Sequence, residues 1–259
     1  MCIIFAAYRS HPDYELIIAA NRDEFYRRPS KAAHFWDDEP NILAGRDLKQ
    51  MGTWMGITKS GRFAALTNYR SPAEFQKPYK RSRGQIVKDF LAGNEAPIEF
   101  LKRLQHKKEE YRGFNILVGD QKELYYYSNI GNQIQKLQAG IYGLSNDQLD
   151  TPWPKAEKGK QHLQQLLNRS NWNCEDLFKL LADHDPAPSD KLPQTGIPVE
   201  LEKMLSSIFI QSPDYGTRCS TVLLIDREHE VHFVERTFDG GTIQDQAFRF
   251  RLTAEEAST

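Results

Sequence analysis

Residues 1–25 read MCIIFAAYRSHPDYELIIAANRDEF and decide the fold, because two short apolar runs flank a turn signal at His11-Pro12-Asp13. Apolar and β-branched runs bounded by such turn residues are typical of antiparallel strands. We therefore predict that residues 2–8 and 15–21 pair as a hairpin. This pairing brings the start of the first strand beside the end of the second.

Strand and helix patterns follow one another in blocks along the rest of the chain. The apolar runs are nearly continuous, which indicates strands covered on both faces. Further strands are predicted in TWMGIT (53–58), RFAALTNY (62–69), NILVGD (115–120), ELYYYSN (123–129), IYGLSN (141–146), STVLLID (220–226), VHFVERTF (231–238) and FRFRL (248–252). A helical period is predicted over 84–91, 97–111, 155–183 in two pieces, and 201–209. This block order predicts segregated layers, an α+β sandwich that forms one domain over residues 1–259.

The composition is that of an ordinary soluble globular protein. Lys and Arg number 34 against 35 Asp and Glu, so no general attraction to nucleic acid or to an acidic membrane is expected. The basic stretch from Lys77 to Arg83 is interpreted as a solvated loop. The first residues lack a secretion leader and no apolar run is long enough to span a bilayer, which predicts a cytoplasmic protein.

The cysteines and histidines form no metal-binding spacing. The three cysteines, Cys2, Cys174 and Cys219, are too few and too far apart in the sequence to stabilise the chain by disulfide bonds, as expected in a reducing compartment. The seven histidines contain no HExxH pattern, and no glycine loop for phosphate is present. The sequence therefore predicts no metal and no cofactor, and it leaves the oligomeric state open.

Cys2 is the most informative single position. Removal of the initiator Met would make it the first residue of the chain, so that one residue carries both a thiol and an α-amine. The thiol would be the nucleophile, and the amine, whose ordinary pKa lies at about 7.7 to 8.0, would be its base. The alternative interpretation is a small buried apolar residue that opens a strand, and position alone favours that alternative.

The polar stretch Asn21-Arg22-Asp23-Glu24 ends the second predicted strand. In the hairpin, Asp23 would reach Cys2 and orient its amine by a charge-assisted hydrogen bond, while Asn21 or Arg22 fixes neighbouring backbone. The alternative is a turn of Asn and Asp with ordinary surface ion pairs. From this stretch alone both interpretations stand.

Several long stretches resemble one known family. They are MCIIF, ANRDEFYRRPS, AGRDLKQMGTWMGIT, RFAALTNYR, SRGQIV, YGLSNDQLDTPWPK and YGTRCSTVLLID. In this order they resemble the NRDE family, the transport-and-Golgi-organisation group, nearly from end to end. That family is similar to N-terminal-nucleophile hydrolases of the penicillin V acylase and bile-salt hydrolase kind, which implies a four-layer αββα sandwich.

The resemblance implies a set of site residues. It implies Cys2 as nucleophile, Asp23 as the carboxylate near its amine, and Asn68 as donor to an oxyanion. It further implies that Asn146 lines the site and that Arg218 lies close to the thiol. A side-chain amide can stabilise a tetrahedral oxyanion, and a guanidinium favours thiolate over thiol. If each residue is considered alone, the two asparagines would more often form hydrogen bonds at strand ends, and Arg218 would more often form a surface ion pair.

One position departs from the acylase pattern. Those acylases place Arg just before the Asn and Asp of this strand end, whereas here Ala20 precedes Asn21 and the arginine is Arg22. Successive strand residues face opposite sides of a sheet, so Arg22 is expected to point away from the nucleophile. The self-base mechanism also requires the removal of Met1, because an amide-linked nitrogen is not a base.

Large aromatic residues and one Pro-rich segment offer further candidates. Trp153 and the His34-Phe35-Trp36 cluster border either a ligand cleft or the core, and Trp54 is assigned to the core. The stretch from Asp185 to Pro198 is a surface connection or a lid, of which the surface connection is the simpler interpretation.

Two functions follow from these observations. The first is a cofactor-free amidohydrolase acting on a non-peptide C–N bond of a small acylated metabolite. The second is a non-catalytic binding or transfer protein for an apolar metabolite, since the NRDE family is associated with haem handling and lipid homeostasis; haem and a lipid or acyl-CoA are the ligands it implies. The fold alone does not separate them, because one scaffold can host either role.

Overall fold

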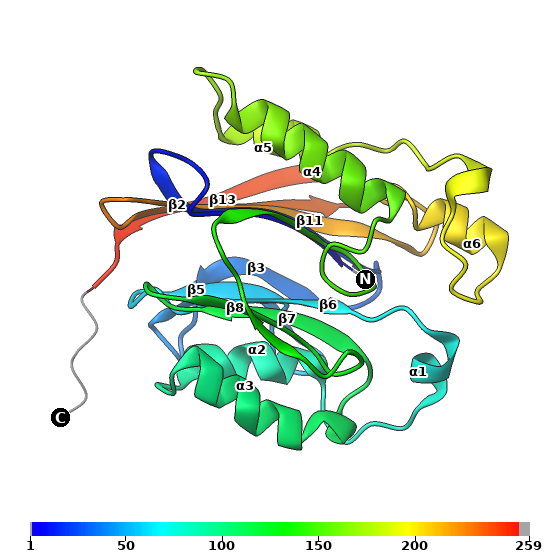
Figure 1. Cartoon of the computed structure of the whole chain (residues 1–259), viewed down its shortest axis with the longest axis horizontal. Coiled ribbons are helices and arrows are strands. Elements are labelled where there is room, and N and C mark those ends of the chain that lie inside the picture. Colours follow the sequence, from blue (N-terminus) through cyan, green and yellow to red (C-terminus); the bar gives the residue numbers. More distant parts are fainter. Residues whose placement is uncertain (1, 254–259) are drawn as a thin grey trace.

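Two antiparallel sheets pack face to face between two helical layers (Figure 1). The computed structural model describes residues 2–253, apart from the side chain of Phe75. Met1 and residues 254–259, which belong to the predicted domain, lie outside the described residues. The α+β sandwich expected from the block order is confirmed, and its layers follow the αββα order.

The first sheet contains the N-terminal hairpin. Its six strands run in the order β10-β1-β2-β11-β12-β13. Their bounds are β1 Cys2–Tyr8, β2 Tyr14–Phe25, β10 Gly140–Leu144, β11 Tyr215–Asp226, β12 Glu230–Asp239 and β13 Thr242–Arg251. As predicted, β1 and β2 pair as a hairpin, with Cys2 opposite Arg22.

The second sheet contains the middle of the chain. Its seven strands run in sequence order from β3 to β9. Their bounds are β3 Ser30–Phe35, β4 Ile42–Asp47, β5 Met55–Thr58, β6 Phe63–Asn68, β7 Phe114–Gly119, β8 Leu124–Ser128 and β9 Ile134–Lys136. Strands β3, β4 and β9 were absent from the sequence prediction.

Helices cover the outer faces of both sheets (Figure 1). Their bounds are α1 Pro72–Gln76, α2 Arg83–Ala92, α3 Pro97–His106, α4 Pro154–Leu167, α5 Cys174–Leu181 and α6 Val199–Met204, with short 3-10 turns at Lys108–Glu110 and Ser189–Lys191. α4 and α5 lie on the first sheet, and α2 and α3 lie on the second. The break predicted near Ser170-Asn171 separates α4 from α5.

The core has three layers. One apolar cluster fills the space between the sheets, with Ile4, Ile18, Leu43 and Leu117 among its members. The other two clusters lie between each sheet and its helices. Burial on both faces explains why the strands read as continuous apolar runs. Within residues 2–253, no helix combines the length and the apolar character needed to cross a membrane.

Gly159 allows α4 to lie close against β1. A methyl group added there would come within 1.9 Å of Cζ of Phe5, whose side chain is fully buried. Alanine would gain about 1 kcal/mol in helix propensity, but overpacking costs about 1 to 3 kcal/mol, and so short a contact lies at the upper end. We expect Gly159→Ala to lower the melting temperature. Adding Phe5→Leu should recover part of the loss, and no recovery would contradict this packing account.

Candidate active site

A cavity of 880 Å³ opens beside the first residues of β1. It is lined by the polar ends of β1 and β2, by the end of β6, by the start of α2, and by residues 197–205 of the segment that contains α6. The two sheets thus contribute opposite walls. Pockets of this size suit a small metabolite.

Cys2 lies in this cavity at the start of β1. Its side chain is partly exposed, and no disulfide involves Cys2, Cys174 or Cys219. Burial raises the pKa of the Cys2 thiol, while the positive charge of Arg22 and a backbone hydrogen bond from Asp23 oppose that rise. The sulfur is therefore mainly a thiol at neutral pH, and a reaction through it needs a base.

Asp23 follows directly after the residue opposite Cys2 and also lines the cavity. Thr217 Oγ1 donates a 2.8 Å hydrogen bond to its Oδ1, and the Tyr215 hydroxyl donates to its backbone carbonyl at 3.1 Å. Burial raises the pKa of this carboxyl group. The hairpin therefore places Cys2 and Asp23 in the lining of one cavity.

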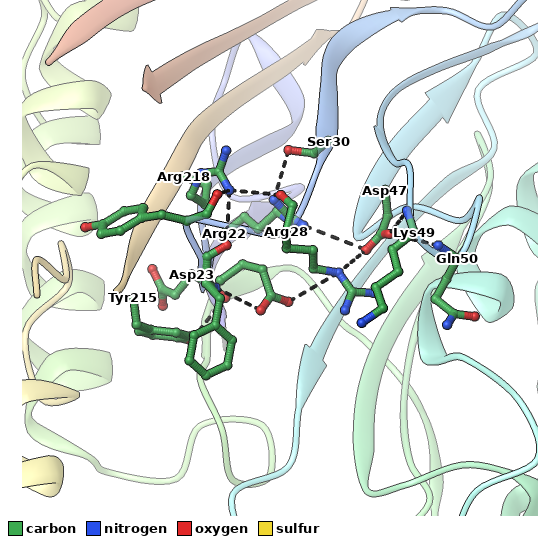
Figure 2. Close-up of polar contacts among 12 residues, drawn as sticks. Arg22, Asp23, Arg28, Ser30, Asp47, Lys49, Gln50, Tyr215 and Arg218 are labelled. Atoms are coloured by element: carbon green, nitrogen blue, oxygen red, sulfur yellow. Dashed lines mark hydrogen bonds and ion pairs between the residues drawn. The ribbon is translucent and has the colours of Figure 1, made fainter. Parts of the chain in front are cut away.

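Arg22 lies on the same face as Cys2, so the expectation that it points away was wrong. Directly paired residues of antiparallel strands share a face of the sheet, and Arg22 is the residue paired with Cys2. Its guanidinium stacks on the Trp54 ring at 4.1 Å and lies 3.9 Å from Asp47 Oδ2. Figure 2 shows it between Ser30 and the Asp47 carboxylate.

Asn21 turns to the other face of the sheet, where it fixes the helical layer. Its Nδ2 donates to the carbonyls of Leu181 and Ile208, at 2.9 and 3.0 Å, and its Oδ1 accepts from Ser220 Oγ at 2.6 Å. Asn21 therefore fixes neighbouring backbone, one of the roles that the sequence left open for Asn21 or Arg22.

The two predicted asparagines differ in position. Asn68, at the end of β6, lines the cavity, and none of the hydrogen bonds found among residues 2–253 uses its side-chain amide. Asn146 is fully buried behind the wall, where its Nδ2 donates to the carbonyls of Asn68 at 3.0 Å and Cys2 at 3.4 Å. Asn68 offers a donor to a ligand, whereas Asn146 holds the backbone of the site.

Arg218 does not line this cavity. Its Nη1 donates to the carbonyls of Phe25, Tyr26 and Arg28, at 3.1, 2.9 and 3.0 Å, and so fixes the loop after β2 (Figure 2). The arginines that share the cavity with Cys2 include Arg22 and Arg83. The resemblance implied that Arg218 lies close to the thiol, whereas the structure places its guanidinium against the loop after β2, outside this cavity.

A buried ionic network, which the sequence analysis missed, supports the site. Arg70 pairs with Glu202 at 2.7 Å, and both side chains are almost fully buried. Lys155 is also buried, and its Nζ donates to the Leu205 carbonyl at 2.9 Å. Burial lowers the pKa of Lys155 to about 7, against the opposing charge of Asp23. Arg70 belongs to the motif RFAALTNYR and Lys155 to DTPWPK. The helical pattern around Lys155 does not indicate that its side chain is buried.

The aromatic candidates divide between cavity and core. Trp54 is half-buried: it packs against the apolar cluster between the sheets, as its assignment to the core requires, and it also lines the cavity. Trp36 and Trp153 are buried outside the cavity lining, and Phe35 packs against Phe248 and Phe250. In the Pro-rich stretch from Asp185 to Pro198, only Ile197 reaches the cavity wall.

A second, smaller cavity lies behind the Arg22–Trp54 stack. Its volume is 320 Å³, and its lining includes Arg22, Trp54, Cys219 and Glu235. Glu235 is buried, and its Oε1 accepts a 2.7 Å hydrogen bond from the Ala33 N–H. Burial raises the pKa of Glu235 to about 7, although Arg22 and the Cys219 thiol oppose the rise.

This buried acid makes stability depend on pH. Between the ordinary glutamate value and about pH 7, the folded protein keeps a proton that the unfolded chain releases, so the free energy of unfolding falls as pH rises through this range. Glu235→Gln is neutral throughout, and we expect a smaller drop in melting temperature between about pH 5 and pH 8. Glu230→Gln, exposed on the same strand, is the control. An unchanged pH dependence in Glu235→Gln would contradict the assignment.

The two helix-covered sheets have the αββα architecture of N-terminal-nucleophile hydrolases. Among solved structures, the chain is similar to a Caenorhabditis elegans N-acylethanolamine-hydrolyzing acid amidase (NAAA) ortholog. The TM-score is 0.52 at 14% identity, over 86% of this chain and 92% of that one, so the likeness concerns the fold.

The chain belongs to the Transport and Golgi organisation 2 family, whose sequence pattern matches residues 1–240. It is 38% identical to the bovine Transport and Golgi organization protein 2 homolog, over 93% of this chain and 94% of that protein. The human homolog is also 38% identical, over 92% and 93%. The Drosophila melanogaster protein is 30% identical, over 93% of both. The family resemblance seen in the sequence is confirmed.

Proposed function

We propose that the protein is a cofactor-free amidohydrolase that cleaves a non-peptide C–N bond of a small acylated metabolite, with Cys2 as nucleophile. The observation that carries this proposal is the shared cavity of Cys2, Asp23 and the Asn68 amide. The N-acylethanolamine-hydrolyzing amidase with the same fold supports the reaction class. The free thiols support a reducing, cytoplasmic setting.

In the first step, the base is the α-amine of Cys2, exposed once Met1 is removed. The amine takes the thiol proton, and Asp23 orients the resulting ammonium group. A base within the same residue suits a thiol whose pKa is raised by burial. Asn146 acts as a positioning residue, because its hydrogen bond to the Cys2 carbonyl fixes the strand end.

In the second step, the thiolate attacks the amide carbonyl and a C–S bond forms. The oxyanion accepts a hydrogen bond from the Asn68 amide, which lies in the cavity wall. The C–N bond then breaks, and the leaving amine takes the proton from the ammonium group. Water, activated by the same α-amine, hydrolyses the thioester and restores the thiol.

An activity screen tests the proposal. Purified protein is incubated with N-acyl amides of varied chain length and amine, and released amine is measured together with transient acyl-protein by mass spectrometry. We expect amine release with an acyl adduct of matching mass. Saturable binding without release across the screen would overturn the proposal.

Asn68→Ala should then lower kcat by about 100- to 1,000-fold with little change in KM, because its amide acts on the oxyanion rather than on the ground state. The matched control is Gln50→Ala, which removes another amide from the cavity lining. Equal losses for both variants, or a loss expressed only in KM, would contradict the role of Asn68.

The apolar part of the cavity supports a second candidate function, non-catalytic binding of haem or of a lipid or acyl-CoA. Ile197, Leu201, Met204 and Leu205 form this wall. Calorimetric titration with haem and with a lipid separates the two candidates. Saturable binding that is unchanged by Cys2→Ala, together with no amine release in the screen, favours the second candidate.

A further inference from the structure

The lining of the large cavity is strongly basic. It includes eight Arg and Lys side chains against three Asp and Glu, whereas the whole chain has a formal net charge of -1. Positive charge is therefore concentrated at this one site. A cavity with one sign of charge favours a ligand of the opposite sign.

Four of these basic groups already have carboxylate partners. Arg28 lies 2.5 Å from Asp47 and 3.7 Å from Glu24, and Arg81 lies 3.3 Å from Glu110. Arg70 pairs with Glu202, and Arg22 lies near Asp47, as described above. These groups are neutralised by the protein itself.

Arg83 and Arg112 are different. Both are half-buried, and neither has an ion-pair partner among the residues that the structure describes. Arg27 and Lys49 also lack such partners, but they are exposed, where water solvates them. A half-buried guanidinium without a counter-charge is costly, so the pair is the more informative feature.

The protein holds these two like charges near each other. Arg83 Nη1 donates to the Gly113 carbonyl at 3.0 Å, and Arg112 Nε donates to the Lys77 carbonyl at 3.0 Å. Arg112 also lies over the Tyr79 ring at 4.5 Å. Burial, and to a smaller extent the charge of Arg112, lower the pKa of Arg83 to about 10. Each guanidinium is fixed through one nitrogen and keeps other N–H groups for a ligand.

This pair shares the cavity with the nucleophile. Cys2, Arg83 and Arg112 all line it, and the negative charge of a Cys2 thiolate raises the pKa of Arg83 against the larger effect of burial. Gly113, which accepts from Arg83, precedes Phe114, the residue paired with Asn68. The basic pair therefore lies at the same sheet end as the proposed oxyanion donor.

We infer that Arg83 and Arg112 bind an anionic group of the substrate, a phosphate, a sulfate or a carboxylate, while its acyl part lies along the apolar wall formed by residues 197–205. Two guanidinium groups match the geometry of such oxyanions and supply charge-assisted hydrogen bonds. The inference rests on the proposed function only in treating the bound ligand as a substrate. The anion site itself does not require catalysis.

The test measures binding in the Cys2→Ala protein, so that turnover plays no part. Octyl phosphate, octanoate and neutral octanol are titrated by calorimetry at low and high salt. We expect octyl phosphate or octanoate to bind at least about tenfold more tightly than octanol, with the preference falling as salt rises. The stronger of the two anions identifies the group. Equal affinity of all three probes would overturn the inference.

Variants assign the preference to the pair. Arg83→Gln and Arg112→Gln should each weaken binding of the preferred anion by about 10- to 100-fold and leave octanol unchanged. Arg249→Gln, exposed on β13 and outside the cavity, removes the same charge and should have no effect. If Arg83→Gln does not fold, Arg83→Lys, which keeps the charge, replaces it in the titration. Equal loss for anion and octanol would mean that the pair only supports the fold.

The two proposals can fail separately. Anion preference without acyl-protein in the activity screen would leave this site standing and remove the hydrolase function. Acyl-protein formation with no anion preference would leave the hydrolase function standing and remove the anion site.

Discussion

Replacing Cys2 by alanine is expected to abolish amide hydrolysis, with a loss in rate of at least about a thousandfold. The proposed reaction passes through a C–S bond, and no other cysteine lines the large cavity. Loss of the sulfur removes the nucleophile and leaves the apolar wall and the basic pair intact. Ligand binding should therefore survive while turnover stops.

Cys174→Ala is the matched control for this loss. Cys174 opens α5 on the outer layer, and burial raises the pKa of its thiol to about 11. Its removal should leave the rate unchanged. If Cys2→Ala keeps turnover within a few-fold of the wild type, the covalent mechanism is wrong.

Replacing Glu202 by alanine is expected to lower the free energy of unfolding by about 3 to 5 kcal/mol, because it leaves the buried charge of Arg70 without its partner. Thr195 would also lose its acceptor on Glu202. Arg70 in turn donates to Asn146 Oδ1 at 3.3 Å, which links this pair to the strand end that carries Cys2. Denaturant unfolding measures the change.

The exposed pair of Lys77 and Glu109 provides the comparison. Glu109→Ala should change stability by less than about 1 kcal/mol, since exposed pairs contribute little. Removing both charges, as in Arg70→Met with Glu202→Leu, should cost less than Glu202→Ala alone. A cost for Glu202→Ala no greater than that for Glu109→Ala would contradict the buried network.

The apolar strand centres were predictable, but the strand ends that form the site were not. β2 continues to Phe25 and β11 begins at Tyr215, both further than the apolar runs extend. Thr217 pairs with Asp23 in this extension. These ends are polar because they line a cavity, and polar residues at the end of an apolar run resemble a turn. The polar residues that form the site therefore also prevent its strand ends from being recognised in the sequence.

The direction of Arg22 was missed for a related reason. Alternation within one strand correctly separates Asn21 from Arg22, but it does not say which of them shares a face with Cys2. That depends on the register between β1 and β2, which pairs Cys2 with Arg22. Likewise, β3 and β4 contain charged residues such as Lys31 and Arg46 that weaken the strand pattern.

The charged residues of the site could be found only in three dimensions. Lys155 sits on a helix and Glu202 on another, far apart in the sequence, and no local pattern marks either as buried. Arg83 stood in a basic stretch that was interpreted as a solvated loop, whereas it begins α2 and lines the cavity. Cys2 and Asp23 were predictable because one hairpin joins them.

The most direct measurement is the mass of the N-terminal peptide from protein quenched during reaction with the amide N-(4-nitrophenyl)butanamide. The account predicts a peptide that begins at Cys2 and carries one butyryl group on its sulfur, with Cys174 unmodified. A peptide that retains Met1, or a Cys2 sulfur that stays free while product accumulates, would contradict it.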